Sequence, residues 1–130
     1  MAKDCVGDCL KNTENYEIKV SLGGAKNNRF NYVQIRPSQK IHFYLFTAFH
    51  LTEENIDELG ELYLFKTPKP EIIKLICEYG SYAHGTVSEH GPITEESVTT
   101  GRNLEYAVRP VFNSKCWKSL LPFQIEESDL

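Results

Sequence analysis

The sequence lacks the long apolar runs of membrane-spanning and secreted proteins. Its most apolar stretch, Ile41–Leu51, is about half the length of a membrane span and contains two histidines. The first residues, MAKDCVGD, contain no apolar run of the kind found in secretory signals. These features predict a soluble, intracellular protein that resides in the cytoplasm and has no membrane partner.

Cysteines are few, and their spacing is not that of a metal site. The four cysteines, Cys5, Cys9, Cys77 and Cys116, include no CxxC pair. Cys5 and Cys9 are four residues apart and could bind zinc with a histidine, but His42 is far along the chain. Without a secretory signal, reduced thiols are favoured over disulfides. We therefore expect free cysteines.

The chain also lacks internal repeats and low-complexity tracts, so its 130 residues predict a single domain. The net charge is −4, but it is unevenly distributed. Residues 1–50 carry seven basic and four acidic side chains, whereas residues 51–130 carry seven basic and fourteen acidic ones. A basic half beside an acidic half is compatible with a polyanionic partner on one face. The acidic end, residues 125–130, is predicted to be a flexible tail.

Hydrophobic periodicity predicts a mixed sheet with few helices, which is an α+β or α/β fold. Strands are expected at residues 5–11, 16–22, 31–37, 40–51, 61–68 and 103–112, and helices at 68–80 and 114–123. The strand at 40–51 is apolar on both faces and is therefore expected at the centre of the sheet. Residues 81–103 are polar and predict a long loop without regular structure.

Three charged residues of the first two predicted strands share one face. A two-residue turn at Thr13–Glu14 pairs Leu10 with Glu17 and Asp8 with Lys19. Because side chains alternate between the faces of a strand, Asp8, Glu17 and Lys19 then point to the same side. Asp8 lies diagonal to Glu17, and diagonal backbone positions are about 7–8 Å apart, so both carboxylates can reach one cation.

This arrangement suits a magnesium site. The carboxylates of Asp8 and Glu17 and the backbone carbonyl of Ile18 are oxygen ligands of the kind that Mg²⁺ prefers, and Mn²⁺ could substitute for it. Lys19, beside the metal, could position an attacking water or stabilise charge that develops on a phosphate. Asp4 is a rival ligand but lies too far from Glu17 in this pairing. The alternative is an ordinary ion pair between neighbouring strands.

The spacing of these residues resembles that of the PD-(D/E)xK nuclease superfamily, and the order of strands resembles type II restriction endonucleases in particular. The matching motif is Asp8, eight residues, and then Glu17-Ile18-Lys19, and the clear resemblance covers residues 6–51. It implies a restriction endonuclease-like core. It also implies Mg²⁺-dependent hydrolysis of double-stranded DNA that leaves 5′-phosphate and 3′-hydroxyl ends. Asp8 and Glu17 would bind the metal, and Lys19 would be the catalytic lysine.

The same resemblance makes Gln34, in the strand NYVQIR, an accessory active-site residue. The core of this superfamily usually begins with a helix before the aspartate strand. Only seven residues precede Asp8, so we expect that helix to be missing, shortened or supplied by a second subunit. Because one site per chain cuts one strand, cleavage of both strands predicts a homodimer.

Four further side chains are candidates for contacts with DNA. Lys26 and Arg29 lie in a Gly/Asn-rich loop next to the proposed site and could contact phosphates, and the alternative is a solvated loop without such contacts. Arg36 lies on the same strand face as Gln34, and its alternative is an ion pair with a surface acid. His84 lies in the long polar segment, where an exposed histidine without a role is the alternative.

Two other functions fit the sequence. One is an inactive nuclease-like subunit that serves assembly or DNA binding. The other is a protein-binding regulatory domain that mimics DNA with its acidic half. Cleavage of a plasmid in the presence of Mg²⁺ would separate the endonuclease from both alternatives.

Overall fold

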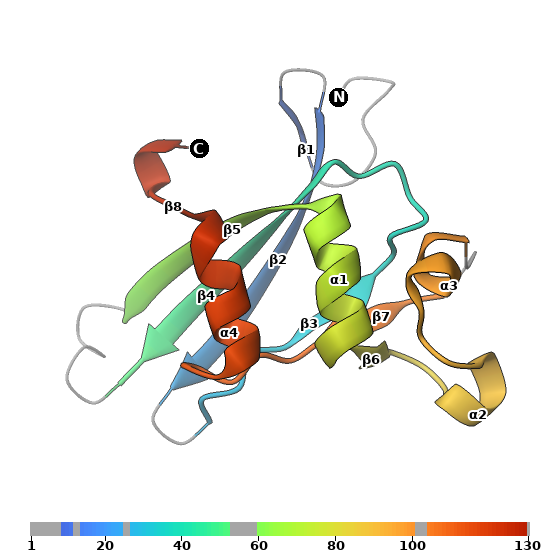
Figure 1. Ribbon diagram of the computed structural model, residues 1–130. Helices are drawn as coiled ribbons and strands as arrows, with labels where there is room; N and C mark the ends of the chain where they lie inside the picture. The colour runs from blue at the N-terminus through green and yellow to red at the C-terminus, as the bar shows by residue number, and fades with distance from the viewer. Residues whose placement is uncertain (1–8, 12–13, 25–26, 53–59, 101–103, 130) are drawn as a thin grey trace.

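The large sheet of this protein has five strands in the order β1-β2-β4-β5-β8 (Figure 1). The computed structural model describes residues 9–11, 14–24, 27–52, 60–100 and 104–129. The strands of the large sheet are β1 (Cys9–Lys11), β2 (Glu14–Gly24), β4 (Phe43–Leu51), β5 (Glu61–Pro68) and β8 (Gln124–Ile125). β2 and β4 are parallel and the other neighbours are antiparallel, so the predicted mixed sheet is confirmed.

A smaller sheet has the order β3-β7-β6, with strands β3 (Tyr32–Ile35), β6 (Ser81–Tyr82) and β7 (Tyr106–Val108). The helices are α1 (Lys69–Tyr79), α2 (Val87–His90), α3 (Glu95–Thr100) and α4 (Lys115–Leu120). Two 3₁₀ turns, η2 (Leu121–Phe123) and η3 (Glu127–Asp129), flank β8. None of the helices in the described ranges is both long and apolar enough to cross a membrane.

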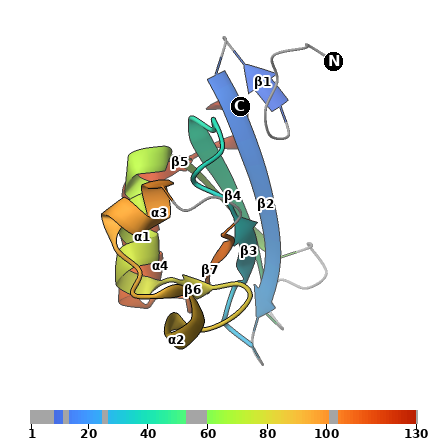
Figure 2. The same ribbon diagram turned by 90° about the vertical axis from the view of Figure 1, so that its right-hand side faces the viewer.

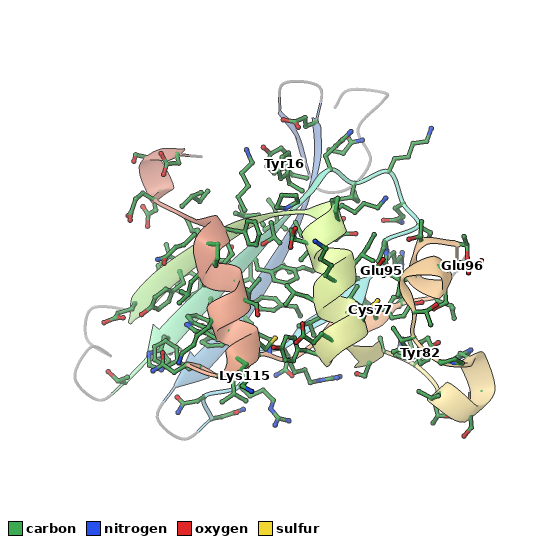
Figure 3. The ribbon with its side chains drawn as sticks, in the orientation of Figure 1. Tyr16, Cys77, Tyr82, Glu95, Glu96 and Lys115 are labelled. Carbon is green, nitrogen blue, oxygen red and sulfur yellow. The ribbon has the colours of Figure 1, made fainter. Side chains whose placement is uncertain are left out.

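The helices lie on one side of the large sheet, as Figure 2 shows, and the core lies between them and the strands. Side chains from α1, α4 and the sheet fill this space (Figure 3). Trp117 of α4 is at its centre and contacts Phe30 and Phe65, with ring centroids 5.2 and 5.1 Å away. Tyr32 of β3 stacks on Phe46 of β4 at 4.2 Å, so the smaller sheet packs on the same face.

The opposite face of β2 carries three exposed apolar side chains. Ile18, Val20 and Leu22 expose 39, 59 and 65% of their surface, and we call them the back row. They alternate along β2 with Glu17, Lys19 and Ser21, which therefore point toward the helices. The alternation places charged side chains on the side of the core and apolar ones on the side away from it.

The prediction of a long loop without regular structure at residues 81–103 is wrong. This segment contains β6, α2 and α3. Side chains that cap backbone groups start the two short helices, because Thr86 accepts from the N–H of Glu89 and Thr94 and Ser97 bond to each other's N–H groups. Val98 is fully buried and fixes α3 to the core. The two short helices therefore form without hydrophobic periodicity in the sequence, because side chains cap their first turns and Val98 is buried in the core.

The first hairpin exists, but its predicted register is wrong by two residues. Leu10 pairs with Asn15, whereas the sequence predicted a pair with Glu17. Asn15 belongs to the strand because its N–H donates to Nδ1 of His42 at 2.8 Å and its side chain donates to the carbonyl of Lys40 at 3.0 Å. Glu17 and Lys19 are two residues apart on β2, so they share a face in either register.

Other boundaries are close to the prediction. The fifth strand runs over Glu61–Pro68 as expected, and β4 lies between β2 and β5, which confirms its central place. The sixth strand is shorter than predicted and spans Tyr106–Val108. The acidic tail is described up to Asp129, and its first residue, Ile125, pairs with Leu64 of β5.

Candidate functional site

The site predicted around Glu17 and Lys19 lies on the core-facing side of β2. The ammonium of Lys19 is 3.3 Å from a carboxylate oxygen of Glu17, and the two side chains expose 15 and 20% of their surface. Their neighbours on β4 are Phe46, opposite Lys19, and Tyr44, opposite Glu17. The pair is therefore shielded from bulk water on the side of the sheet centre, where charges interact more strongly than on an open surface.

Gln34 meets this pair through its backbone. Lys19 Nζ donates to the carbonyl oxygen of Gln34 at 3.3 Å, while the Gln34 residue as a whole is exposed. Gln34 has φ +56°, a left-handed conformation that is uncommon in residues other than glycine. β3 and β7 shift register between Tyr32 and Ile35, where this residue lies. The irregularity turns the Gln34 carbonyl toward Lys19, whereas the resemblance had assigned a role to the side chain.

Two residues with buried hydroxyl groups are aligned with Glu17 across the neighbouring strands. Tyr44 is opposite Glu17 on β4, and Thr67 is opposite Tyr44 on β5. Both residues are almost completely buried, and neither hydroxyl has a hydrogen-bond partner among the described residues. Burial, and then the nearby Glu17 carboxylate, raise the pKa of Tyr44 above its ordinary value. Tyr44 lies in the strand that the sequence placed at the centre of the sheet, but the sequence gave no sign that its hydroxyl would lack a hydrogen-bond partner.

Two of the three predicted metal ligands, Glu17 and Ile18, lie in the described ranges. Glu17 offers a carboxylate and Ile18 follows it on β2, so hard oxygen donors of the kind that suit Mg²⁺ are present. Within the ranges that the structure describes, no three His, Cys, Asp or Glu side chains are grouped closely enough to hold a metal ion. Asp8, the second predicted carboxylate, lies outside the described residues, as does Asp4.

Arg36 and His84 converge on one carboxylate. The Nε and Nη2 atoms of Arg36 both donate to Oε1 of Glu105, and Nε2 of His84 is 3.6 Å from Oε2 of the same residue. The ion pair with an acid, given above as the alternative for Arg36, is thus present. We call these three residues the Glu105 cluster, and the sequence gave no indication that Glu105 would join them.

Arg29 is not next to Glu17. Its segment follows the end of β2, where the N–H of Gly24 donates to the carbonyl of Asn27 at 2.7 Å. β2 is longer than predicted, so Gly24 is seven residues from Glu17, or about 23 Å at 3.3 Å per residue. Arg29 also bridges to Val111 and is exposed. Lys26, the other predicted contact in this loop, lies outside the described residues.

The chain was compared with models of protein families, with curated proteins and with solved structures. None of the three comparisons finds a match.

Proposed function

We propose that this chain is a metal-dependent endonuclease that hydrolyses phosphodiester bonds of double-stranded DNA and has a restriction endonuclease-like core. The main support is the pair formed by Glu17 and Lys19. A carboxylate and an ammonium group lie 3.3 Å apart on one face of β2, partly shielded from water. The order of the chain adds to this, because the pair lies on the strand that runs beside the aromatic strand β4.

In this proposal, Asp8, Glu17 and the backbone carbonyl of Ile18 hold Mg²⁺, and Mn²⁺ could replace it. When bound, the metal lowers the pKa of a coordinated water and neutralises charge on the phosphate. Lys19 orients the water oxygen that attacks phosphorus, and the bond from phosphorus to the 3′ oxygen breaks. The attacking water loses a proton to solvent, and the departing 3′ oxygen takes one up from solvent. The products are a 5′-phosphate and a 3′-hydroxyl. The Gln34 carbonyl supports the reaction indirectly, since it fixes the ammonium of Lys19.

A plasmid-cleavage assay tests the proposal. With Mg²⁺ the wild-type protein should convert supercoiled plasmid to open and linear forms, and EDTA should stop the conversion. Lys19→Ala should lower the cleavage rate at least 100-fold, because general-acid–base and charge-stabilising groups contribute about 10²–10⁴-fold. Lys74→Ala is the matched control, since Lys74 forms a similar 3.4 Å ion pair with Glu71 but is exposed on α1.

One result would decide against the endonuclease, and another against the role of Lys19. Absence of cleavage by the wild-type protein at every concentration, with Mg²⁺ and with Mn²⁺, would exclude it. Equal loss of activity in Lys19→Ala and Lys74→Ala would remove Lys19 from the reaction. Circular dichroism spectra of both variants establish that they are folded.

The back row supports a second candidate function, that of a nuclease-like subunit without its own activity. Three large apolar side chains exposed in a row along one strand are typical of surfaces that bind another protein. An inactive subunit of this kind would bind DNA in a salt-dependent way without cutting it. A protein-binding regulatory domain, the other alternative, would bind neither DNA nor metal. Titration with a labelled duplex at several salt concentrations distinguishes these outcomes.

A further inference from the structure

A cavity of about 300 Å³ lies beside the Glu105 cluster and is lined by Arg36, Ser38, Gln39 and Glu105. Cavities that hold small ligands begin at about this volume. The lining offers a guanidinium, a hydroxyl and an amide, which are hydrogen-bond donors. Donors of this kind around a small cavity suit an anion with several acceptor oxygens.

The turn that carries Arg36 is held in place by its backbone. The N–H of Gln39 donates to the carbonyl of Arg36 at 3.1 Å, which closes the turn. The ammonium of Lys69 donates to the carbonyl of Gln39 at 2.7 Å and so lies against the same turn. Two cationic groups, those of Arg36 and Lys69, are therefore held near the cavity.

Glu105 occupies the guanidinium of Arg36 in a way that a phosphate could reproduce. Its Oε1 accepts from both Nε and Nη2 of Arg36. Phosphate and carboxylate oxygens use the same donor edge of a guanidinium group. The other oxygen, Oε2, is buried and accepts no hydrogen bond from the described residues, and Nε2 of His84 lies 3.6 Å from it, beyond hydrogen-bond distance. A buried carboxylate oxygen without a hydrogen bond costs free energy, so moving Glu105 away from Arg36 gives up less than moving a fully hydrogen-bonded carboxylate would.

We propose that the cavity beside Arg36 is a phosphate-binding subsite in which the carboxylate of Glu105 takes the place of the phosphate when no ligand is bound. On binding, the phosphate takes over the guanidinium and the Glu105 side chain moves away from it. Arg36 lies two residues after Gln34, whose carbonyl accepts from Lys19, so one short segment joins the subsite to Lys19. The proposed function supplies one source of the phosphate, the DNA backbone, and in this respect the inference rests on it.

Nuclear magnetic resonance of the Arg36 Nε–Hε group tests the subsite directly. Inorganic phosphate should shift this signal in a saturable way in the wild-type protein. Glu105→Gln keeps the shape of the side chain and an acceptor oxygen but removes the competing charge. This variant should bind phosphate at least tenfold more tightly than the wild type. The gain should disappear in Arg36→Gln/Glu105→Gln.

Glu71→Gln is the control for net charge, because it removes a carboxylate whose ion pair with Lys74 lies outside the cavity. It should change phosphate affinity less than twofold. An equal gain in Glu71→Gln, or a gain that survives the loss of Arg36, would overturn the subsite. So would an unchanged Arg36 signal in the wild-type protein, a result that needs no folded variant.

The source of the phosphate follows from a parallel titration with a 12-base-pair DNA duplex in EDTA. Tighter binding of the duplex than of inorganic phosphate, with the same gain in Glu105→Gln, assigns the subsite to the DNA backbone. Tighter binding of inorganic phosphate supports the subsite but assigns it to a free anion. EDTA prevents cleavage, so binding is measured without the reaction. A negative plasmid assay therefore counts against the endonuclease, whereas a negative phosphate titration counts against the subsite.

Discussion

Tyr32 and Tyr44 are two core tyrosines that differ in their hydrogen bonds. Each exposes 1% of its surface, and both pack against Phe46. The hydroxyl of Tyr32 donates to the carbonyl of Thr47 at 3.0 Å, whereas that of Tyr44 has no partner among the described residues. A buried hydroxyl without a partner costs free energy, so the two residues offer a matched comparison.

Tyr44→Phe should raise the free energy of unfolding by about 1 kcal/mol, because it removes a buried polar group without a partner. Tyr32→Phe should lower the same free energy by about 1 kcal/mol, because it removes a hydrogen bond. Urea unfolding of the two variants beside the wild type measures both changes. A loss of stability in Tyr44→Phe would show that its hydroxyl has a partner, and a loss of plasmid cleavage would connect the hydroxyl to Glu17.

Cys116 should be unreactive in the folded protein. Burial, and then the carboxylate of Glu78, raise its pKa to about 11, so it stays a neutral thiol at pH 8 and forms thiolate only as the pH approaches 11. Cys77 is less buried, and Figure 3 shows it on α1 on the side of α3, where Glu95 lies. We expect iodoacetamide at pH 8 to label Cys116 only after addition of urea. Mass spectrometry of the labelled peptides checks this, and rapid labelling without urea would contradict it.

At the scale of elements, strong periodicity predicted the structure and weak periodicity did not. α1 follows the sequence closely because Ile72, Leu75 and Ile76 form one buried stripe and Pro70 suits its first turn. The short helices α2 and α3 were missed because they contain few apolar residues. The register of the first hairpin was also missed, since the contacts that hold Asn15 come from residues 25 and 27 positions away.

The side-chain cap at the start of α4 should contribute clearly to the stability of the protein, although the helix is short. The side chain of Ser114 accepts from the N–H of Trp117 at 3.3 Å, and Trp117 is the largest side chain of the core. Ser114→Ala should lower the free energy of unfolding by about 1 kcal/mol, the usual loss for a helix cap. Ser119→Ala, later in the same helix, is the control and should change it less. Thermal unfolding followed by circular dichroism compares the two, and equal losses would contradict a capping role.

At the scale of the whole molecule, the sequence indicated which residues share a face but not how far apart the loops would lie. Glu17 and Lys19 came together because alternation along one strand is a local property. The Glu105 cluster could not be predicted, since Arg36 and Glu105 are 69 residues apart and meet only through the pairing of β3 with β7. The prediction that Arg29 lies next to Glu17 failed for a similar reason, because the distance between them depends on the full length of β2.

The back row should tolerate polar residues. Val20→Thr/Leu22→Thr should change the free energy of unfolding by less than about 1 kcal/mol, since exposed positions contribute little. It should also reduce self-association at high concentration, measured by sedimentation velocity. Val98→Thr is the control, because it buries a hydroxyl and should cost about 1–3 kcal/mol. Equal costs in the two variants would show that the back row is covered.

The alternation along β2 also limits how the length of this strand can change. Deletion of Val20 would carry Ser21 to the outer face and Leu22 to the inner one, whereas Glu17 and Lys19 would stay in place. A deletion of one residue of β2 before Glu17 would move each residue that precedes the deletion to the opposite face of the strand, while Glu17 and Lys19 kept their face. Changes of two residues preserve both faces, so natural or designed variants of this strand should differ in length by even numbers.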